Sequence, residues 1–246
     1  MERSITLSVV SHGQNALVNH LLADIRRVCA RRVAVVITEN IPDDAPLDTA
    51  ALDCPVEILE NSRRQGFGAN HNAAFQRCRT PYFCVCNPDI RLPQDPFPEL
   101  LSSLADPQVA VVGPLVSSPT GAIEDSARRY PTAMGLAKKL LSGSTSPDYP
   151  TDAGPISVDW IGGMFMLFRA DAFRAINGFD ESYFMYYEDV DLCARSRLDR
   201  RTVIYDPRAQ VTHDARRESR RNPSLALHHF ASILRFLFRH RVPPRT

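Results

Sequence analysis

Short apolar runs alternate with amphipathic segments along the first half of the chain, and this alternation limits the fold more than any other feature. The apolar runs predict strands at 5–10, 33–38, 56–59, 82–86 and 109–112. The segments between them predict helices at 16–29, 69–78 and 96–105. Strands separated by helices are typical of a parallel sheet that is covered on both faces. We therefore expect an α/β fold with a mostly parallel central sheet flanked by helices.

The second half of the chain is predicted to hold shorter elements. A segment rich in Ser, Pro, Gly and Asp predicts a mobile loop at 142–155. A strand-like run at 158–168 is interrupted by two glycines, and a last strand is expected at 203–205. The predicted helices of this half lie at 171–176, 189–197 and 225–239, and the last of them is amphipathic.

Charge and cysteine content argue against several classes of protein. The chain has 29 basic and 28 acidic residues, a net charge of +1, which does not indicate a nucleic-acid-binding protein. Six cysteines occur without a CxxC pair, which disfavours zinc or a disulfide framework and favours reduced thiols in a cytoplasmic protein. We expect no signal peptide, and no apolar run reaches the roughly 18 residues that a membrane span needs.

Polar residues follow four of the predicted strands at the point where each strand ends. They are Ser11-His12-Gly13, Glu39-Asn40, Asn61 with the loop after it, and Asn87-Pro88-Asp89. In parallel α/β sheets, ligands bind beyond the carboxyl ends of the strands. The sequence therefore predicts a ligand site at this edge of the sheet.

Three single residues near strand ends each allow two interpretations. Asp89 suits a hard divalent cation that shares phosphate ligands, or it belongs to an Asx turn closed by the preceding proline. Glu39 could accept a hydrogen bond from a nucleotide base or ribose, or it lies in a solvated turn. His213 follows the last predicted strand and is a candidate metal ligand, although a lone histidine is more often structural.

The stretch NSRRQGFGANHNAAF at 61–75 contains two glycines and two arginines, and it places Asn70 and Asn72 at the start of a predicted helix. Close backbone approach, a helix N-terminus and nearby arginines together suit a phosphate group. The stretch does not match GxxxxGK[ST], which argues against a Walker-type NTPase. A glycine turn with helix caps is the structural alternative.

Three acids within four residues, Glu188, Asp189 and Asp191, follow the aromatic run at 183–187. Packed carboxylates repel one another, so such a run either lies in solvent or holds something positive or proton-bearing. Asp189 is predicted to begin a helix, whose dipole favours its charge, and could take a proton from a hydroxyl group. An acidic capping box on a structural helix is the alternative.

The order of these signals resembles family 2 inverting glycosyltransferases with a GT-A-type fold, especially their bacterial rhamnosyltransferase-like branch. The order is strand and acid, glycine-asparagine loop, NPD, WIGG, FDESYFMYYEDVDLC and a late histidine. The resemblance extends from Ile5 to about Arg239. It is most specific at 160–195, WIGGMFMLFRADAFRAINGFDESYFMYYEDVDLCAR.

The resemblance implies roles for individual residues. Asp189 would be the catalytic base, and acceptor or base positioning would fall to Glu188, Asp191, Trp160 and Gly163. Asp89, in this branch's version of the DxD motif, and His213 would hold Mg²⁺ or Mn²⁺ on the donor diphosphate. Nucleotide-sugar contacts would come from Ser11, Glu39, Asn40, Arg64, Gly68, Asn72 and Asn87. The chain departs from the family where Ser11-His12-Gly13 replaces the usual Thr-Tyr-Asn and where Glu39 replaces the usual Asp.

The resemblance also implies the reaction and the domain organisation. A sugar, with dTDP-rhamnose as the expected donor, would move to a hydroxyl group of a glycan or lipid-linked acceptor in bacterial cell-surface polysaccharide synthesis. Residues 1–212 would form the GT-A domain, with a nucleotide-sugar half at 1–112 and an acceptor half at 113–212, and 213–246 a basic helical tail. A sugar-nucleotide nucleotidyltransferase would need a glycine-rich basic loop that Ser11-His12-Gly13-Gln14 does not supply. A non-catalytic nucleotide-sugar-binding or scaffold protein is the other rival hypothesis.

The C-terminal tail is basic, with eight arginines against two acids from residue 213 onward. Its predicted helix places apolar residues on one face and arginines on the opposite face: Phe230, Ile233, Leu234 and Leu237 against Arg235 and Arg239. Such a helix suits peripheral contact with an anionic membrane, here the cytoplasmic face of the inner membrane. It equally suits packing on the protein's own body or in a homodimer. The acids at the strand ends argue against nucleic-acid binding there.

Overall fold

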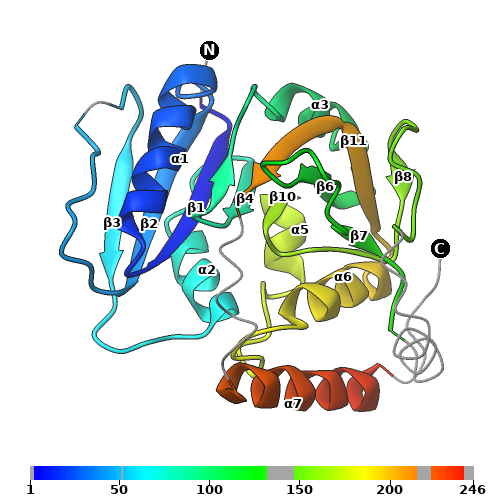
Figure 1. Cartoon of the computed structure of the whole chain (residues 1–246). Coiled ribbons are helices and arrows are strands. Elements are labelled where there is room, and N and C mark those ends of the chain that lie inside the picture. Colours follow the sequence, from blue (N-terminus) through cyan, green and yellow to red (C-terminus); the bar gives the residue numbers. More distant parts are fainter. Residues whose placement is uncertain (1–2, 51, 132–146, 215–222, 241–246) are drawn as a thin grey trace.

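The chain folds around one large sheet with helices on both faces (Figure 1). The computed structural model describes residues 3–50, 52–131, 147–214 and 223–240. The strands are β1 (Ile5–His12), β2 (Val33–Ile41), β3 (Val56–Glu60), β4 (Tyr82–Cys86), β5 (Ile90–Arg91), β6 (Val109–Ser117), β7 (Ala127–Arg128), β8 (Ile156–Ser157), β9 (Trp160–Ile161), β10 (Phe165–Arg169) and β11 (Thr202–His213). The helices are α1 (Asn15–Val28), α2 (Phe67–Phe75), α3 (Phe97–Ser103), α5 (Ala170–Ala175), α6 (Glu188–Leu198) and α7 (Pro223–Arg239).

The main sheet is parallel at one end and mixed at the other. Among the described residues its strand order is β3-β2-β1-β4-β10-β6-β11-β5, with β8 beside β11. β3, β2, β1 and β4 run parallel, as the alternation of strands and helices predicts, and so do β6 and β11. β10 lies antiparallel between β4 and β6, and β5 and β8 run antiparallel to β11. The prediction of a mostly parallel sheet therefore describes the N-terminal half better than the C-terminal half.

Two strands extend well beyond their predicted ends. β6 continues through a Gly-Pro pair to Ser117, although this pair indicates a turn in the sequence. β11 spans Thr202–His213, and its register against β6 shifts just beyond the residue opposite Pro114. A proline is tolerated beside such an irregularity, because the ladder of hydrogen bonds is already interrupted there. The boundary proposed after residue 212 therefore falls inside β11.

The other predicted elements are present, with ends that differ by a few residues. The strand-like run at 158–168 is divided into β9 and β10 around its two glycines. Of the loop predicted at 142–155, residues 142–146 lie outside the described part of the chain, and 147–155 contain no helix or strand.

Alternate residues of the central strands point into two separate hydrophobic layers. In β10, Phe165 and Leu167 lie in the layer that includes α1 and α3, whereas Met166 and Phe168 lie in the layer that includes α2, α5 and α6. This is the two-residue period of an extended strand. The sheet is covered on both faces, which explains why its strands are continuously apolar in the sequence.

Helix α7 lies beneath α6, on the outer side of the second layer (Figure 1). Phe236 anchors it, fully buried in a small cluster with Tyr130, Val190 and Ala194. Phe236 is not part of the apolar face predicted from the sequence. The helix therefore packs on the protein's own body, which was one of the alternatives left open for it.

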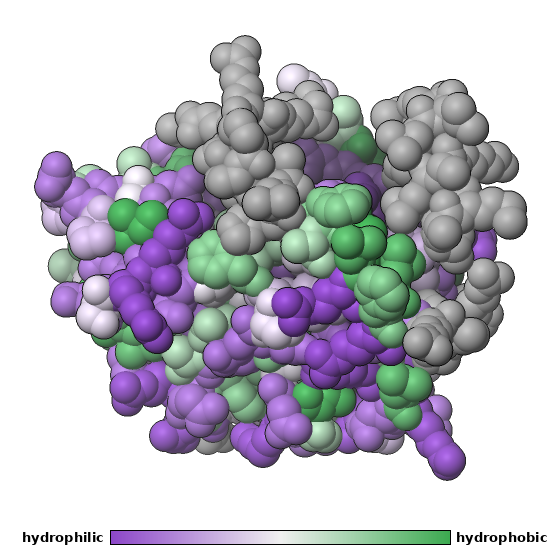
Figure 2. Space-filling view, turned by 90° about the horizontal axis from the view of Figure 1, so that it is seen from below, coloured by the Kyte–Doolittle hydropathy of each residue, from purple (hydrophilic) through white to green (hydrophobic). Residues whose placement is uncertain are grey.

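The outer face of α7 carries exposed apolar side chains. Phe230, Leu234 and Phe238 are 59%, 39% and 74% exposed and lie four residues apart, on one side of the helix. Viewed from below, apolar side chains gather in a band beside hydrophilic ones (Figure 2). The predicted apolar face is thus split, because Ile233 and Leu237 are half-buried while Phe230 and Leu234 point to solvent. None of the described helices has the length and apolarity that crossing a membrane requires.

Candidate active site

The carboxyl ends of β1, β2 and β4 lie side by side at one edge of the sheet. Ser11 of β1 is paired with Glu39 of β2. Val9 of β1 is paired with Cys86 of β4, the residue that precedes Asn87. Three predicted nucleotide-sugar ligands that are distant in sequence therefore share the edge at which α/β sheets bind ligands.

Asp189 lies in the first turn of α6, where two backbone N–H groups fix its carboxylate. Gly163 N–H donates to Oδ2 at 2.8 Å, and Val190 N–H donates to Oδ1 at 2.8 Å. Gly163 belongs to the loop between β9 and β10. A Cβ there would lie 3.3 Å from the Phe67 ring and 3.6 Å from Asp189 Cβ, so the loop leaves little room for a larger residue. The carboxylate is thus presented in one fixed direction.

Burial raises the pKa values of both Glu188 and Asp189, and the two carboxyl groups interact. For Asp189, the N–H groups of Gly163 and Val190 and the charge of Arg128 oppose the effect of burial. For Glu188, burial and then the charge of Asp189 raise the pKa well above its ordinary value. Burial therefore favours the protonated form at both positions, and the N–H groups of Gly163 and Val190 counteract this effect at Asp189.

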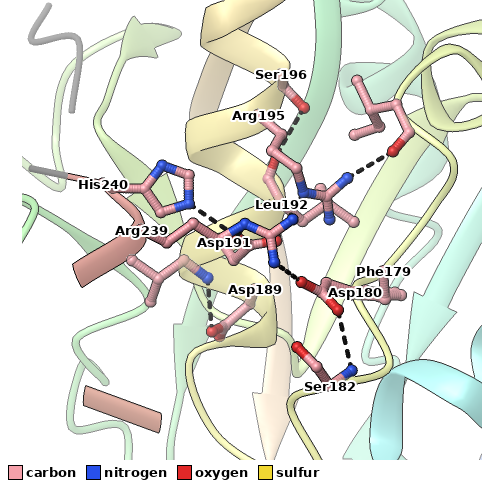
Figure 3. Close-up of polar contacts among 12 residues, drawn as sticks. Phe179, Asp180, Ser182, Asp189, Asp191, Leu192, Arg195, Ser196, Arg239 and His240 are labelled. Atoms are coloured by element: carbon pink, nitrogen blue, oxygen red, sulfur yellow. Dashed lines mark hydrogen bonds and ion pairs between the residues drawn. The ribbon is translucent and has the colours of Figure 1, made fainter. Parts of the chain in front are cut away.

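Asp191 is turned towards α7 and is fully buried (Figure 3). Its Oδ2 accepts a hydrogen bond from Arg195 Nε at 2.7 Å, and its Oδ1 lies 2.8 Å from His240 Nε2. Residues two positions apart on an α-helix point in nearly opposite directions, which separates Asp191 from Asp189. Both oxygens of Asp191 thus have protein partners, which suits a positioning role, and a contact of Asp191 with the acceptor stays a prediction.

Trp160 is packed between two elements. Its indole Nε1 donates to Arg129 O at 3.0 Å, and the guanidinium group of Arg128 lies 5.5 Å from the ring centroid. The ring also packs against the cluster around Phe236. A contact of Trp160 with the acceptor stays a prediction.

Asp89 and His213 meet where β5 pairs with the end of β11. His213 Nε2 lies 3.2 Å from Asp89 Oδ2, and His213 Nδ1 lies 2.7 Å from Glu124 Oε2. Burial lowers the pKa of His213, but the two carboxylates outweigh burial and raise the pKa to about 9. His213 therefore carries a proton between two acids.

Asp89 also has an oxygen that is suited to a cation. Its Oδ1 is buried and has no hydrogen-bond partner among the described residues. An unpartnered carboxylate oxygen is a fitting ligand for Mg²⁺ or Mn²⁺. In the part of the chain that the structure describes, no group of three or more His, Cys, Asp and Glu side chains is arranged to hold a metal ion. A cation would therefore depend on Asp89 together with oxygens of the donor diphosphate, and His213 would join only after losing its proton.

Glu124 is an acid of the site that sequence analysis missed. Its backbone N–H donates to Val116 O at 2.8 Å, so the extension of β6 to Ser117 brings it to His213. The predicted strand ends at residue 112, and Glu124 is then simply a loop residue. Only a prediction that β6 continues past its Gly-Pro pair could have found it.

Two backbone hydrogen bonds connect the Asp89 region with the base. Asn87 N–H donates to Met164 O at 2.9 Å, and the neighbouring Gly163 N–H donates to Asp189. The loop before β10 thus bridges the end of β4 and the start of α6. This loop therefore connects the segment that contains Asp89 with the turn that contains Asp189, although the two are distant in sequence.

Several predicted nucleotide-sugar ligands are held by other protein groups. Asn15 Nδ2 donates to Glu39 Oε1 at 2.9 Å, and Ser11 Oγ donates to Asn15 Oδ1 at 2.7 Å. Asn40 Nδ2 donates to Gln65 O at 2.9 Å, and Gln65 N–H donates to Asn40 Oδ1 at 2.7 Å. Asn15, which sequence analysis did not single out, orients two of the strand-end residues. Direct contacts of Ser11, Glu39 and Asn40 with a nucleotide stay predictions.

Gly68 and Asn72 of α2 pack against the turn that precedes the carboxylate segment. Asn72 Nδ2 donates to Phe179 O at 2.9 Å, and Phe179 N–H donates to Asn72 Oδ1 at 2.9 Å. A Cβ on Gly68 would lie 2.6 Å from Phe179 Cβ, so a larger residue would displace the ring. The amide assigned to the nucleotide sugar is thus engaged in holding this turn. Arg64 is exposed, with its guanidinium group 5.3 Å from the centroid of the Phe184 ring.

Solved structures with the same fold are glycosyltransferases. The mannosyltransferase PcManGT from Pyrobaculum calidifontis, in complex with GDP-Man and Mn²⁺, matches with a TM-score of 0.62 and 16% identity over 96% of this chain, which spans 65% of that protein. GalNAc-T7 with UDP, GalNAc and Mn²⁺ matches with a TM-score of 0.68 and 14% identity over 89% of this chain and 45% of its own. These likenesses establish a GT-A-type fold, the fold class that these two glycosyltransferases share.

Sequence comparison then places the chain within that class. The family model for glycosyl transferase family 2 matches residues 20–175. An N-acetylglucosaminyl-diphospho-decaprenol L-rhamnosyltransferase of Mycobacterium tuberculosis is 27% identical over 94% of this chain and 83% of its own length. The rhamnosyltransferase WbbL of Escherichia coli K12 is 30% identical over 72% of both chains. The chain belongs to glycosyl transferase family 2, which confirms the family expected from the sequence motifs.

Proposed function

We propose that this glycosyltransferase is an inverting, metal-dependent enzyme that transfers rhamnose from dTDP-rhamnose to a hydroxyl group of a lipid-linked glycan in bacterial cell-surface polysaccharide synthesis. The names of two curated relatives, both rhamnosyltransferases, support the donor sugar, and the decaprenol diphosphate in one name supports the acceptor class. The observation that carries the reaction is the carboxylate of Asp189, held 2.8 Å from Gly163 N–H in the same site as Asp89.

Asp189 is the proposed general base. It accepts the proton of the acceptor hydroxyl group while that oxygen bonds to the anomeric carbon and the bond from that carbon to the diphosphate breaks. Attack from the face opposite the diphosphate inverts the anomeric configuration. The N–H of Gly163 keeps the carboxylate of Asp189 in a fixed orientation.

The strand-end residues are the proposed donor site. Asp89, with its unpartnered oxygen, would hold Mg²⁺ or Mn²⁺, with His213 beside it. When bound, such a cation neutralises charge that develops on the departing diphosphate. Arg64 is exposed and available to the phosphates, and Glu39 would accept a hydrogen bond from the nucleotide base or ribose. Ser11, Asn40 and Asn87 would complete the donor site. Gly68 and Asn72 would support it indirectly, by packing against the turn at Phe179.

Replacing the proposed base tests this mechanism. Asp189→Asn preserves the size of the side chain but removes the proton acceptor. Turnover with dTDP-rhamnose and a polyprenyl-diphosphate glycan should fall by about 10²–10⁴-fold, because general-base assistance is lost. Donor affinity in the presence of Mn²⁺, measured by calorimetry, should stay unchanged. Asp171→Asn, which alters an exposed acid of α5, is the matched control and should behave as the wild type.

Turnover of the Asp189→Asn variant close to that of the wild type would remove Asp189 as the base. A thermal-shift panel of nucleotide sugars with and without Mn²⁺ would identify the donor independently of turnover. Binding of a donor by the wild-type protein without release of the nucleotide in the presence of an acceptor would instead identify a nucleotide-sugar-binding protein.

We also propose that the outer face of α7 contacts the cytoplasmic surface of the membrane that carries the acceptor. Three exposed apolar side chains, Phe230, Leu234 and Phe238, form this face. The tail supplies eight arginines against two acids, which complements an anionic bilayer. Helices with this combination lie in the membrane interface. A second copy of the chain on the same face, giving a homodimer, is the alternative that the membrane experiment below distinguishes.

A further inference from the structure

The inner face of α7 lies along residues 180–191, the segment that contains the proposed base. The contacting residues recur at 229, 232 and 236 in α7 and at 240 directly after it, which is the spacing of one helix face. Three polar contacts join the two segments: Ser232 Oγ to Met185 O at 3.0 Å, His240 Nε2 to Asp191 Oδ1 at 2.8 Å, and Arg239 to Asp180. Figure 3 shows the last two of them beside Asp189.

Two aromatic rings of α7 contact the middle of the same segment. The His229 ring lies 5.1 Å from the ring of Tyr186 and 5.6 Å from the ring of Tyr187, edge to face in both cases. The Phe236 ring lies 5.7 Å from the ring of Tyr187. The polar contacts lie on both sides of these two tyrosines along the chain.

The two tyrosines have a backbone conformation that needs support. Tyr186 and Tyr187 have φ angles of 70° and 68°, in the left-handed region that side chains larger than glycine disfavour. Such residues persist only where the surrounding structure holds them. Tyr187 directly precedes α6, so its backbone sets the direction in which the first turn, with Asp189, leaves the segment. The contacts from α7 are concentrated at this strained point.

A contact from the end of α7 also reaches Asp191, in the first turn of α6 itself. The carboxylate of Asp191 accepts hydrogen bonds from His240 on one oxygen and from Arg195 on the other. Arg195 Nη1 in turn donates to Ile176 O at 2.6 Å, at the end of α5. The fully buried carboxylate of Asp191 therefore joins α7 to the rigid part of the fold behind the base.

We propose that α7 is a brace for the catalytic segment and that Ser232 and His240 are positioning residues for the transfer reaction. They hold the left-handed pair of tyrosines so that α6 begins where Asp189 meets the N–H of Gly163. The role of Asp189 in this inference rests on the proposed function. The family match ends at residue 175, so the brace lies outside the matched segment.

Replacing the two polar contacts tests the brace. His240→Leu and Ser232→Ala, alone and combined, remove one hydrogen bond each without touching the proposed donor site. The combined variant should lose about 10- to 100-fold in kcat, because a base displaced by about 1 Å is poorly oriented. The donor Kd with Mn²⁺ should stay within about twofold, since Asp89 and the strand ends are unchanged. His240→Gln, which keeps an N–H donor for Asp191, should recover most of the kcat that His240→Leu loses.

A matched control separates positioning from loss of stability. Arg208→Ala removes the partner of another fully buried acid, Asp206, whose Oδ2 lies 2.7 Å from Arg208 Nη2. It should lower the unfolding midpoint but leave kcat unchanged below that midpoint. The single tryptophan, Trp160, packs against the Phe236 cluster, so its fluorescence should change in the His240→Leu variant and stay unchanged in the Arg208→Ala variant.

Wild-type kcat in the combined variant would overturn the brace, as would an equal loss of kcat in the Arg208→Ala control. A parallel loss of donor affinity in the combined variant would also overturn it, because the site as a whole would then be disturbed. Absence of sugar transfer by the wild-type protein is a separate result, which would overturn the proposed function and with it the catalytic role of the brace.

Discussion

Asp189 and Asp191 are the same amino acid two positions apart, yet their surroundings give them different properties. Two N–H groups support the charge of Asp189, which leaves the carboxylate able to accept a proton. Asp191 instead has Arg195 on one oxygen and His240 on the other. At the scale of residues, the hydrogen-bond partners of an acid decide its chemistry more than its place in a motif.

The unpartnered oxygen of Asp89 predicts the effect of removing its charge. Asp89→Asn keeps the volume of the side chain but removes the charge that the unpartnered Oδ1 offers to a cation. Affinity for the donor in the presence of Mn²⁺ should fall by about 10- to 100-fold, in the range seen when metal-site residues are altered. Calorimetric titration with Mn²⁺ and with EDTA measures the effect. Glu124→Gln, which changes only the second partner of His213, should lose less donor affinity. Unchanged donor affinity of the Asp89→Asn variant with Mn²⁺ would remove Asp89 from the metal site.

Sequence analysis found residues that belong to contiguous motifs and missed residues that distant segments supply. Asp89, Gly163 and Asp189 each stand in a short recognisable string, and the structure brings them together. Asn15 has no such string around it, and its bond to Glu39 exists only because β1 and β2 are neighbours. Asn72 matches a ligand-binding pattern, but Phe179, 107 residues away, occupies its amide. Contacts of this kind depend on the tertiary fold, which local pattern does not contain.

At the scale of elements, α2 and the turn that contains Gly178 form one unit. Gly178 has a φ of +63°, and Asn72 of α2 closes on the turn from the side. The unit fixes where the segment towards α6 begins, while α7 fixes where it ends. The sequence predicted α2, but not its contact with this turn.

The closeness of this contact predicts the effect of adding one methyl group. Gly178→Ala and Gly121→Ala both place a side chain at positive φ, at +63° and +81°. The new Cβ at Gly178 would lie 2.4 Å from Asn72 Oδ1, whereas nothing lies within 4 Å of the one at Gly121. We expect Gly121→Ala to lower the free energy of unfolding by about 1 kcal/mol and Gly178→Ala by about 2–4 kcal/mol. Urea denaturation measures both, and equal losses would show that the contact with Asn72 contributes nothing.

The extended strands show what element prediction lacks. A Gly-Pro pair indicates a turn when it is considered locally, yet β6 passes through it because β11 changes register beside it. Both β6 and β11 therefore end later than predicted. For this reason Glu124 was not recognised, and the predicted domain boundary after residue 212 falls inside β11. The information lies in the pairing of β6 with β11, two strands that are far apart in the sequence.

At the scale of the whole molecule, α7 has two faces with different neighbours. Its inner face contacts the catalytic segment, and its outer face exposes Phe230, Leu234 and Phe238. A membrane bound to the outer face would place the proposed base near the surface where a lipid-linked acceptor lies. Sequence analysis predicted an amphipathic helix here but could not divide its apolar residues between the two faces, because either side of the helix is apolar enough to be buried.

Vesicle binding tests the outer face. Phe230→Ser with Phe238→Ser removes two exposed aromatic side chains, and binding to anionic vesicles should weaken by at least about tenfold, since each aromatic group contributes apolar area to insertion. Co-sedimentation with anionic and with zwitterionic vesicles measures this, and the wild type should prefer the anionic ones. Leu198→Ser is the control. Leu198 is 62% exposed at the end of α6, and its replacement should leave vesicle binding unchanged.

Equal sedimentation of the variant and the wild type would contradict the membrane contact. A dimer that forms without vesicles and is lost in the same variant would assign the outer face to a second copy of the chain.

Strand β10 lies in the middle of the sheet, yet it is translated after both of its neighbours, β4 and β6. A nascent chain that has left the ribosome as far as β6 therefore presents two open sheet edges, and hydrogen-bonding groups at such edges recruit other chains. The gap closes only when Phe165–Arg169 emerges and inserts antiparallel between them. During synthesis this topology keeps the centre of the sheet open until β10 emerges, and β11 joins the other side of β6 only after that. Until both strands are in place, the unfinished chain exposes strand edges that are prone to aggregation.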